Sequence, residues 1–473
     1  MKKTFYKYSL PAMLLVILLA ACSKNFIEKI PYDSIPLNSA LSDQVGVTNA
    51  LNGAYAQLRS ANLWGRDLPV IGDIQADNTF VESKNSGRYI PQYNYNIVNT
   101  DGVAAEIWTT AYTAILRCNQ IITATATGGT VPQIKAQAYA LRALLYFKLV
   151  NLFARPLTDT PDGLGVPLVL TYSPTVLPTR SKISEVYTQI ISDFKAGFAN
   201  GPAYVNSITL SKYAIEGLLA KAYLYMGDNA NAKAAAADVI TNGGFTLVTP
   251  GAYANYWANG AIQTNAVETM FEVDADAINN NGFDDLGGIY INGYQDIYAS
   301  KQLVSLYSKT DIRNAVLIFN GLTKSGAPAT FVNKYSNAQN SDRDNLKVIR
   351  LSEVYLIAAE ASLPASPTDA LKYLNTLMAQ RDPGFVYTST GTQLLNDIVQ
   401  ERRKELAFEG DRLFDLNRLK QPIVRVQNAG AIPAGQGNTF LTIPYTDYRR
   451  IYPIPLSEIQ ANANIASQQN PGY

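Results

Sequence analysis

The densest group of chemically active side chains is the segment 401–418, "ERRKELAFEGDRLFDLNR", which places ten charged residues in eighteen positions. Glu401 and Glu405 lie one turn apart on a predicted helix, and a pair of carboxylates is what a glycoside hydrolase uses. An acid catalyst needs a raised pKa, however, and the three cations between these two residues would keep both carboxylates ionised. We therefore interpret the segment as scaffolding, with Glu401 pairing with Lys404 and Arg402 with Glu405 on the helix surface.

The composition removes several other classes of chemistry. The chain has no histidine, which excludes Ser-His-Asp and Cys-His catalysis and histidine metal sites. Its 39 basic and 38 acidic residues nearly cancel, and no long basic run is present to bind nucleic acid. No Walker A, dinucleotide-binding or Cys-x-x-Cys motif occurs, so no cofactor is expected. A hydrophobic fraction of 47% over 473 residues is ample for a folded core.

We expect the first residues to form an export signal. Lys2, Lys3 and Lys7 precede an apolar stretch at 9–21, "SLPAMLLVILLAA", which is of signal-peptide length and short for a membrane span. The stretch ends in Leu-Ala-Ala-Cys at Cys22, which resembles a bacterial lipobox, in which the cysteine thiol is acylated and becomes the new N-terminus. We expect residues 1–21 to be removed and Cys22 to be the lipidated residue that anchors the chain to a membrane without spanning it.

The residues that follow form a tether, and the second cysteine is structural. Residues 22–40 contain two prolines and no periodicity, which indicates an extended segment between the lipid and the folded body. Cys118 then has no partner for a disulfide, and we expect it to be a small buried residue on a helix. Trp108, in the same helical segment, is expected in the core.

Helical periodicity dominates the remaining chain, 41–473, which we predict to be a single, mainly α-helical domain. Several segments form helix pairs with a turn between them, as in tetratricopeptide repeats. The predicted helical segments are 41–60, 102–125, 131–154, 182–198, 211–227, 228–243, 348–381 and 394–410, the last closed by Gly410. We predict a scaffold of helix pairs, with long irregular loops and a few short β-strands on the opposite side.

Two stretches between the helices differ in character. Residues 61–101 and 244–346 are rich in Asn, Asp, Gly and aromatic residues and are too long for ordinary connections, which favours a functional role. The segment 274–285, "DADAINNNGFDD", is dense in oxygen ligands but lacks the spacing of a calcium-binding loop. We expect a solvated turn there and no metal site.

Five segments, in this order behind the lipobox, resemble the SusD/RagB family of outer-membrane lipoproteins. They are "IWTTAYTAILRCNQII" (107–122), "AYALRALLYFKLVNLFARP" (138–156), "VIRLSEVYLIAAEA" (348–361), "ERRKELAFEGDRLFDLNRLK" (401–420) and "YPIPLSEIQANANIASQQNPGY" (452–473). The resemblance implies a helical fold with tetratricopeptide-like pairs. It also implies a non-enzymatic protein that faces the cell exterior, binds an oligosaccharide or other nutrient, and caps a SusC-like TonB-dependent transporter.

The resemblance also implies that the two loop stretches form the ligand surface. A sugar needs flat apolar side chains for its ring and polar groups for its hydroxyls. The expected ligand residues in the two stretches are Trp64, Asp77, Asn78, Arg88, Tyr93, Tyr95, Trp257, Phe283, Asp284, Tyr290 and Tyr294. Tyr93 and Tyr95 would point the same way in an extended segment.

Two other functions fit parts of the sequence. A glycoside hydrolase using carboxylates alone would hold an Asp/Glu pair in a cleft and release reducing sugar. A helical-repeat adaptor would use its helical faces for a protein partner and bind no small molecule.

Overall fold

The computed structural model describes residues 37–173, 175–338, 340, 343–433 and 441–473. The predicted signal peptide, the lipidation residue Cys22 and the tether up to residue 36 lie outside the described residues.

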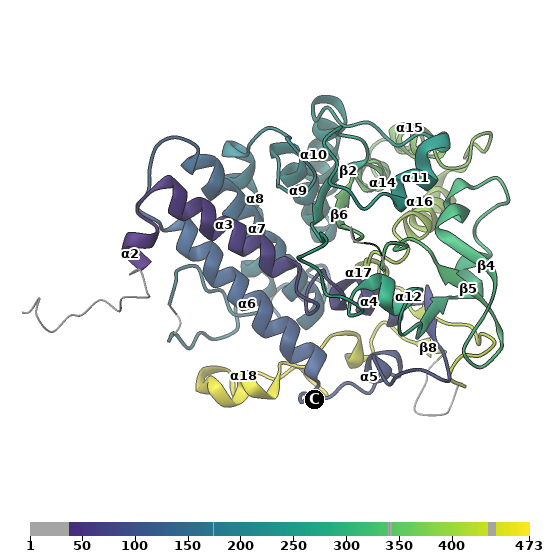
Figure 1. The fold of residues 1–473 in the computed structure, drawn as a ribbon, viewed down its shortest axis with the longest axis horizontal. Coiled ribbons are helices and arrows are strands. Elements are labelled where there is room, and N and C mark those ends of the chain that lie inside the picture. The colour runs from purple at the N-terminus through teal and green to yellow at the C-terminus, as the bar shows by residue number, and fades with distance from the viewer. Residues whose placement is uncertain (1–36, 174, 339, 341–342, 434–440) are drawn as a thin grey trace, which may run out of the picture.

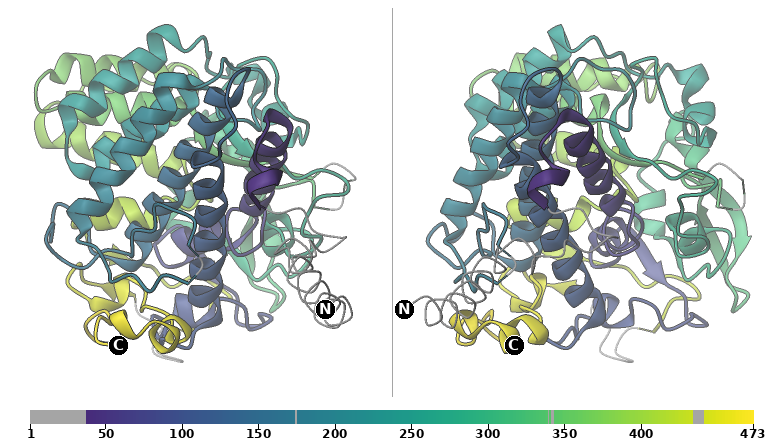
Figure 2. Two further views of the ribbon diagram at one scale, coloured as in Figure 1. Left: turned by 90° about the vertical axis from the view of Figure 1, so that its left-hand side faces the viewer. Right: turned by 60° about the vertical axis from the view of Figure 1, so that its left-hand side comes forward.

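A layered array of helices runs from the left of the molecule across its top to the upper right (Figure 1). Its members are α3 (Gln44–Leu58), α6 (Gly102–Ile122), α7 (Val131–Phe153), α8 (Ile183–Asn200), α9 (Lys212–Met226), α10 (Asn229–Asn242), α14 (Leu351–Ser362), α15 (Pro367–Met378) and α16 (Gly391–Glu405). From α6 to α10, each helix packs against the next, and α14 then packs on α10 and carries α15 and α16. Figure 2 shows the same helices stacked side by side from two further directions. The predicted helix pairs are therefore confirmed.

Local sequence sets the ends of these helices. The Asp101 carboxylate accepts a hydrogen bond from the backbone N–H of Ala104 and caps α6. The α9–α10 pair, which resembles a tetratricopeptide repeat, is joined at Gly227. Gly227 has a φ of +76°, a conformation that favours glycine, and Asp228 directly after it caps α10.

Two predicted boundaries are wrong. The segment predicted as helix from residue 348 begins as strand β6 (Leu346–Arg350), because β6 pairs with β2 (Thr269–Val273), which lies far away in the sequence. Helix α16 ends at Glu405 and not at Gly410, since the intervening residues form a turn in which Phe408 has a φ of +69°.

The other side of the molecule carries the two long loop stretches and the small sheets, as predicted. A four-stranded antiparallel sheet has the order β1-β3-β5-β4, with β1 (Thr79–Val81), β3 (Ile297–Ala299), β5 (Pro328–Val332) and β4 (Leu317–Leu322). Strand β7 (Ile423–Val424) pairs with β8 (Thr442–Ile443). The short helices on this side and at the C-terminus are α4 (Asp67–Ile74), α5 (Ile90–Tyr93), α11 (Tyr253–Ala258), α12 (Leu286–Tyr290), α13 (Lys301–Val304), α17 (Arg412–Arg418) and α18 (Leu456–Ala461), and α2 (Leu37–Ala40) precedes the array.

The core runs through both sides. Trp108 and Cys118 are buried in it, as predicted, and Cys118 is a free thiol. Burial raises the pKa of that thiol to about 12, which makes it unreactive. Within the described ranges, the helices are either too short or too polar to traverse a bilayer.

Two glycines allow α4 to lie directly on the turn that follows α16. A Cβ on Gly72 would lie 1.9 Å from the carbonyl oxygen of Gly410, and a Cβ on Gly410 would lie 2.5 Å from the Cα of Pro69. Only glycine therefore permits this backbone contact, which joins the loop stretch 61–101 to the charged segment.

We predict that Gly72→Ala lowers the free energy of unfolding by about 1–3 kcal/mol or more, because the added methyl group must push two backbone segments apart. Gly102→Ala is the matched control, since Gly102 begins α6 and a Cβ there would meet nothing within 4 Å. Denaturant unfolding of both variants measures the difference. Equal midpoints for the two variants would contradict the close packing of α4.

Candidate functional site

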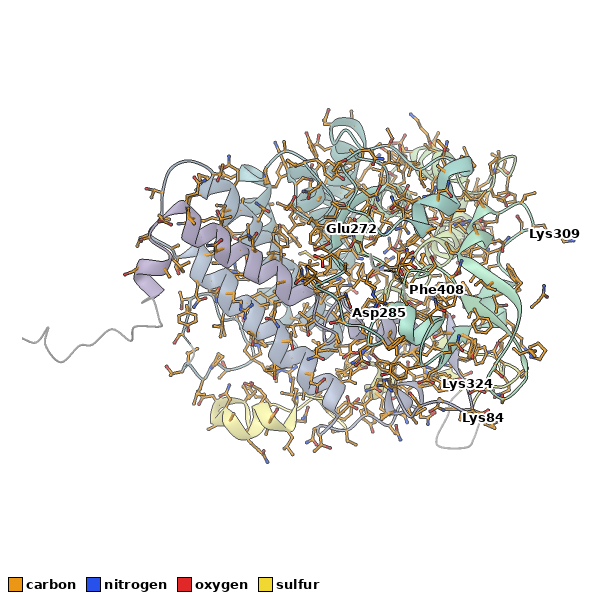
Figure 3. All side chains as sticks on the ribbon, viewed as in Figure 1. Lys84, Glu272, Asp285, Lys309, Lys324 and Phe408 are labelled. Carbon is orange, nitrogen blue, oxygen red and sulfur yellow. The ribbon has the colours of Figure 1, made fainter. Side chains whose placement is uncertain are left out.

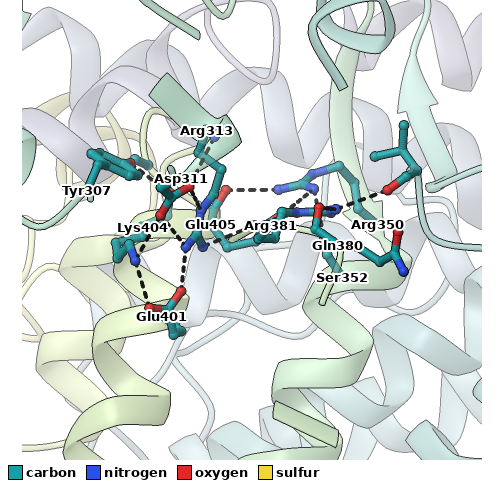
Figure 4. Close-up of polar contacts among 12 residues, drawn as sticks. Tyr307, Asp311, Arg313, Arg350, Ser352, Gln380, Arg381, Glu401, Lys404 and Glu405 are labelled. Atoms are coloured by element: carbon teal, nitrogen blue, oxygen red, sulfur yellow. Dashed lines mark hydrogen bonds and ion pairs between the residues drawn. The ribbon is translucent and has the colours of Figure 1, made fainter. Parts of the chain in front are cut away.

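The charged segment 401–418 is buried, and its side chains hold other elements in place. The Glu405 carboxylate is fully buried and accepts hydrogen bonds from Arg350 at 2.8 Å and from Arg381 at 3.0 Å (Figure 4). Arg313 lies 3.4 Å from the same carboxylate and donates to Glu401 at 2.7 Å. Arg313, Arg350 and Arg381 come from three different parts of the chain, so this carboxylate joins the helical array to the loop side.

The contacts extend into a balanced network, which we call the Glu405 network. It contains five carboxylates and five cations joined by ion pairs, namely Glu268, Asp311, Glu401, Glu405, Glu409, Arg313, Lys334, Arg350, Arg381 and Lys404. Burying a charge costs free energy unless the charge is paired and hydrogen-bonded. The equal numbers of negative and positive charges in the network therefore allow it to be buried inside the protein.

The electrostatics exclude the predicted pair of carboxylates as acid catalysts. Burial alone would raise the pKa of Glu405, but the guanidiniums of Arg381 and Arg350, with that of Arg313, outweigh burial and hold the pKa well below its usual range. Glu401 is also fully buried and bound to Arg313 and Lys404. The interpretation of this segment as scaffolding is confirmed.

The pairing within the segment was predicted only in part. Glu401 and Lys404 pair at 2.8 Å, but in the interior and not on the helix surface. Arg402 does not pair with Glu405. It binds Glu353 at 2.9 Å and Asp415 at 3.0 Å, because it lies on the side of α16 that packs against α14, the helix that carries Glu353.

Asp77 and Asn78, predicted as ligand residues, are buried partners of the charged segment. Arg412 binds the Asp77 carboxylate at 2.7 Å, and Arg403 donates to the Asn78 side-chain oxygen at 2.9 Å. Burial would raise the pKa of Asp77, but Arg412 and Arg403 outweigh it and lower that pKa. The prediction that these two residues contact a ligand is wrong, since neither exposes a free polar group.

Tyr93 and Tyr95 are also buried, and they do not lie in an extended segment. Tyr93 ends α5, and Tyr95 has a φ of +55° and donates its hydroxyl hydrogen to the Gln75 carbonyl. The Arg425 guanidinium lies 4.5 Å from the centre of the Tyr93 ring and 5.2 Å from that of Tyr95. Both rings therefore stack on an arginine of the protein itself and are not available to a sugar.

Three further aromatic residues of the expected ligand surface lie in the core. Trp64, Trp257 and Tyr290 are all less than 5% exposed. Tyr290 stacks on Tyr335, with ring centres 6.1 Å apart, and Lys334 lies 4.2 Å from the Trp257 ring. These residues pack the loops onto their own domain, which corrects the prediction that they face a ligand.

The remaining four predicted residues lie at the surface, and three of them contact one another. The Arg88 guanidinium lies 3.4 Å from the centre of the Tyr294 ring, and it lies 3.5 Å from the Asp284 carboxylate. Arg66, which is not among the predicted ligand residues, binds the same carboxylate at 3.0 Å. Phe283 next to Asp284 is 57% exposed. We call Arg66, Arg88, Phe283, Asp284 and Tyr294 the loop-face cluster.

Hydrogen bonds to the buried carboxylate of Asp296 hold the loop-face cluster in position. The Asp296 carboxylate, next to β3, accepts hydrogen bonds from the backbone and hydroxyl of Ser86 and from Lys324 at 2.8 Å. Lys324 also donates to the Tyr294 carbonyl at 2.7 Å, from the β4–β5 turn at the lower edge of the sheet side (Figure 3). Three loops far apart in the sequence are thus fixed together around one accessible aromatic and charged surface.

The Asp/Asn-rich segment at 274–285 forms a turn. Asp276 accepts hydrogen bonds from the backbone N–H groups of Ile278 at 2.7 Å and Asn279 at 2.6 Å. Within the part of the chain that the structure describes, no three acidic or cysteine side chains gather as a metal-binding group.

Two family models match this chain. Residues 308–473 match a family described as the SusD family, and residues 25–224 match one described as starch-binding associating with outer membrane. With the helical-repeat fold above, these matches place the chain in the SusD/RagB family. Neither match includes residues 225–307, which carry Phe283, Asp284 and Tyr294 of the loop-face cluster.

Individual relatives agree along nearly the whole chain. SusD-like protein P2 of Formosa agariphila is 28% identical over 99% of this chain and 100% of its own length. A crystal structure of a SusD superfamily protein from Bacteroides thetaiotaomicron matches with a TM-score of 0.83 at 28% identity, covering 91% of this chain and 100% of that one. A putative sugar binding protein from Bacteroides vulgatus gives the same TM-score and identity, covering 92% and 99%.

We predict that Glu405→Gln lowers the free energy of unfolding by about 3–5 kcal/mol, because three buried guanidiniums lose their shared negative charge. Glu106→Gln is the control, since Glu106 is exposed on α6. Chemical denaturation monitored by circular dichroism measures both. A variant at 405 that is as stable as the one at 106 would show that the Glu405 network does not hold the fold together.

We further predict that Trp64→Ala and Tyr290→Ala each cost about 3–5 kcal/mol of stability, as large aromatic residues in a core do. Phe283→Ala, which removes an exposed ring, should leave the melting temperature within a few degrees of the parent protein. Thermal unfolding compares the three variants. Unchanged melting temperatures for Trp64→Ala and Tyr290→Ala would return those residues to the ligand surface.

Proposed function

We propose that this protein binds an oligosaccharide nutrient at its loop face and delivers it to a TonB-dependent transporter in the outer membrane. The observation that carries the proposal is the loop-face cluster, in which the Arg88 guanidinium lies over the Tyr294 ring and pairs with Asp284, the sequence neighbour of the exposed Phe283. An exposed ring suits the C–H face of a sugar, and the arginine and carboxylate suit its hydroxyls.

Preorganisation supports this use of the cluster. Arg88 is held between a ring and a carboxylate, and Arg66 fixes the same carboxylate from α4. Because these side chains already have defined positions, a ligand would lose little free energy in ordering them. A family described as starch-binding and a relative called a putative sugar binding protein support carbohydrate as the ligand class.

The cellular setting is part of the same proposal. Acylation of Cys22 would hold the protein at the outer membrane, and the folded body would face the exterior, where a nutrient arrives. The description of the matching family as associating with the outer membrane supports this location. A SusC-like transporter would receive the ligand, as the family resemblance implies. We propose no catalytic role, since the paired carboxylates of the charged segment serve the scaffold.

The test is a calorimetric titration of the full-length protein in detergent with α- and β-glucans, xylans, mannans, pectins and host glycans. We expect saturable binding to at least one neutral oligosaccharide and no new reducing ends. We also expect Arg88→Ala and Phe283→Ala to weaken that binding by about 1–2 kcal/mol each with unchanged melting temperature.

Phe385→Ala is the matched control, because Phe385 is 46% exposed in the loop between α15 and α16. It should bind as the parent does. Product formation would favour the hydrolase, and a panel without any binding would favour the adaptor. Equal losses for Phe283→Ala and Phe385→Ala would remove the loop-face cluster from the binding site.

A further inference from the structure

A separate groove lies along the four-stranded sheet. Its volume is about 310 Å³, and its walls come from β1, β3, β4, β5, α13 and the loop at 428–429. Phe80 and Phe319 supply apolar surface, and the side chains of Asn320 and Thr330 are the polar groups of the wall formed by β4 and β5. None of these residues belongs to the loop-face cluster.

Among the residues described, the only charged side chain that lines this groove is a positive one. Lys301 lines it and is exposed, and no Asp or Glu is among the lining residues in the described part of the chain. Within the same described residues, Lys301 forms no ion pair. Its backbone is fixed, because its N–H donates to the side-chain oxygen of Asn428 at 2.8 Å. The groove therefore has an ammonium group on its wall that no carboxylate of the described residues pairs with, carried by a residue whose backbone is fixed.

The outer wall of the groove has an irregular backbone. Strand β4 lies at one edge of the sheet, and its pairing with β5 shifts register between Ile318 and Gly321. Within this bulge Asn320 has a φ of +63°, and Phe319 is 42% exposed. A Cβ on Gly321 would lie 1.9 Å from the Phe331 ring, so a larger residue there would have to displace that ring. Bulges of this kind re-aim side chains and are common beside binding sites.

The two surfaces differ in the charge that they offer a ligand. At the loop-face cluster, Arg66 and Arg88 both pair with Asp284, and Arg66 also pairs with Asp67 at 2.8 Å. The two positive charges are thus balanced by two carboxylates, and the cluster suits uncharged hydroxyls. Lys301 has no such partner, and an isolated ammonium group in a groove attracts an anion. The ring of Phe319, together with Asn320 and Thr330, adds contacts of the kind that sugars use.

We propose that this groove is a second subsite that binds an anionic sugar unit, a uronate or a sulfate ester, with Lys301 as its charge partner. The inference rests on the proposed glycan-binding function and adds the charge class of the ligand. Carboxylate and sulfate share the chemistry that Lys301 recognises, and the test separates them.

The experiment titrates the full-length protein in detergent with three probes. These are an oligogalacturonate, a sulfated carrageenan-type oligosaccharide and a neutral laminari-oligosaccharide, each at low and high salt. The variants are Lys301→Gln, Lys301→Arg and, as the matched control, Lys309→Gln. Lys309 is an exposed lysine at the outer edge of the sheet side and does not line the groove (Figure 3).

We expect one of the two anionic probes to bind, and the probe that binds identifies carboxylate or sulfate. Lys301→Gln should weaken that binding by about tenfold or more, because a charge-assisted hydrogen bond is lost. Lys301→Arg should retain most of it, and Lys309→Gln all of it. High salt should weaken the binding of the anionic probe and leave the binding of the neutral probe unchanged.

Three results would overturn the inference: no binding of either anionic probe, no effect of Lys301→Gln, or an equal loss in Lys309→Gln. Retained binding of a neutral oligosaccharide in that case would leave the proposed function intact, because that ligand belongs to the loop-face cluster. Circular dichroism confirms that each variant is folded, which is expected for a substitution of an exposed side chain.

Discussion

The Glu405 carboxylate, enclosed by Arg313, Arg350 and Arg381, is the contact on which the rest of the structure depends. It lies at the end of α16, while its three partners come from the loop side, from β6 and from the end of α15. Removing one member of such a network leaves several charges buried without compensation, so the network behaves as a unit. It fixes the loops relative to the helical array in one arrangement.

The same charged segment reaches the loops on its other faces. Arg403 and Arg412 bind the loop after α4 through Asp77, and Gly410 lies directly on α4. The loop side is therefore a firm platform even though its strands are short. The loop side carries two accessible surfaces, the loop-face cluster and the groove along the sheet. The arrangement suits a protein that presents fixed contacts to a ligand and whose buried carboxylates are committed to structure.

Sequence periodicity predicted the helical array because apolar residues recur along its helices and several of these helices begin at a local cap, as at Asp101 and Ser211. The ligand residues were predicted less well because exposure depends on distant partners. Asp77 is buried by Arg412, 335 positions away, and Tyr93 by Arg425, 332 positions away. Arg66 was missed for the same reason, since its partner Asp284 is 218 positions distant.

The central claim is that the loop side, supported by the buried charge network, is where an oligosaccharide binds. A crystal structure of the protein with an oligosaccharide that it binds in solution tests this most directly. We predict that sugar rings will lie against Phe283, Arg88 and Tyr294, with the Glu405 network unchanged. A sugar bound to the outer faces of α6 to α10, or a carboxylate of the charged segment turned toward the glycosidic bond, would contradict it.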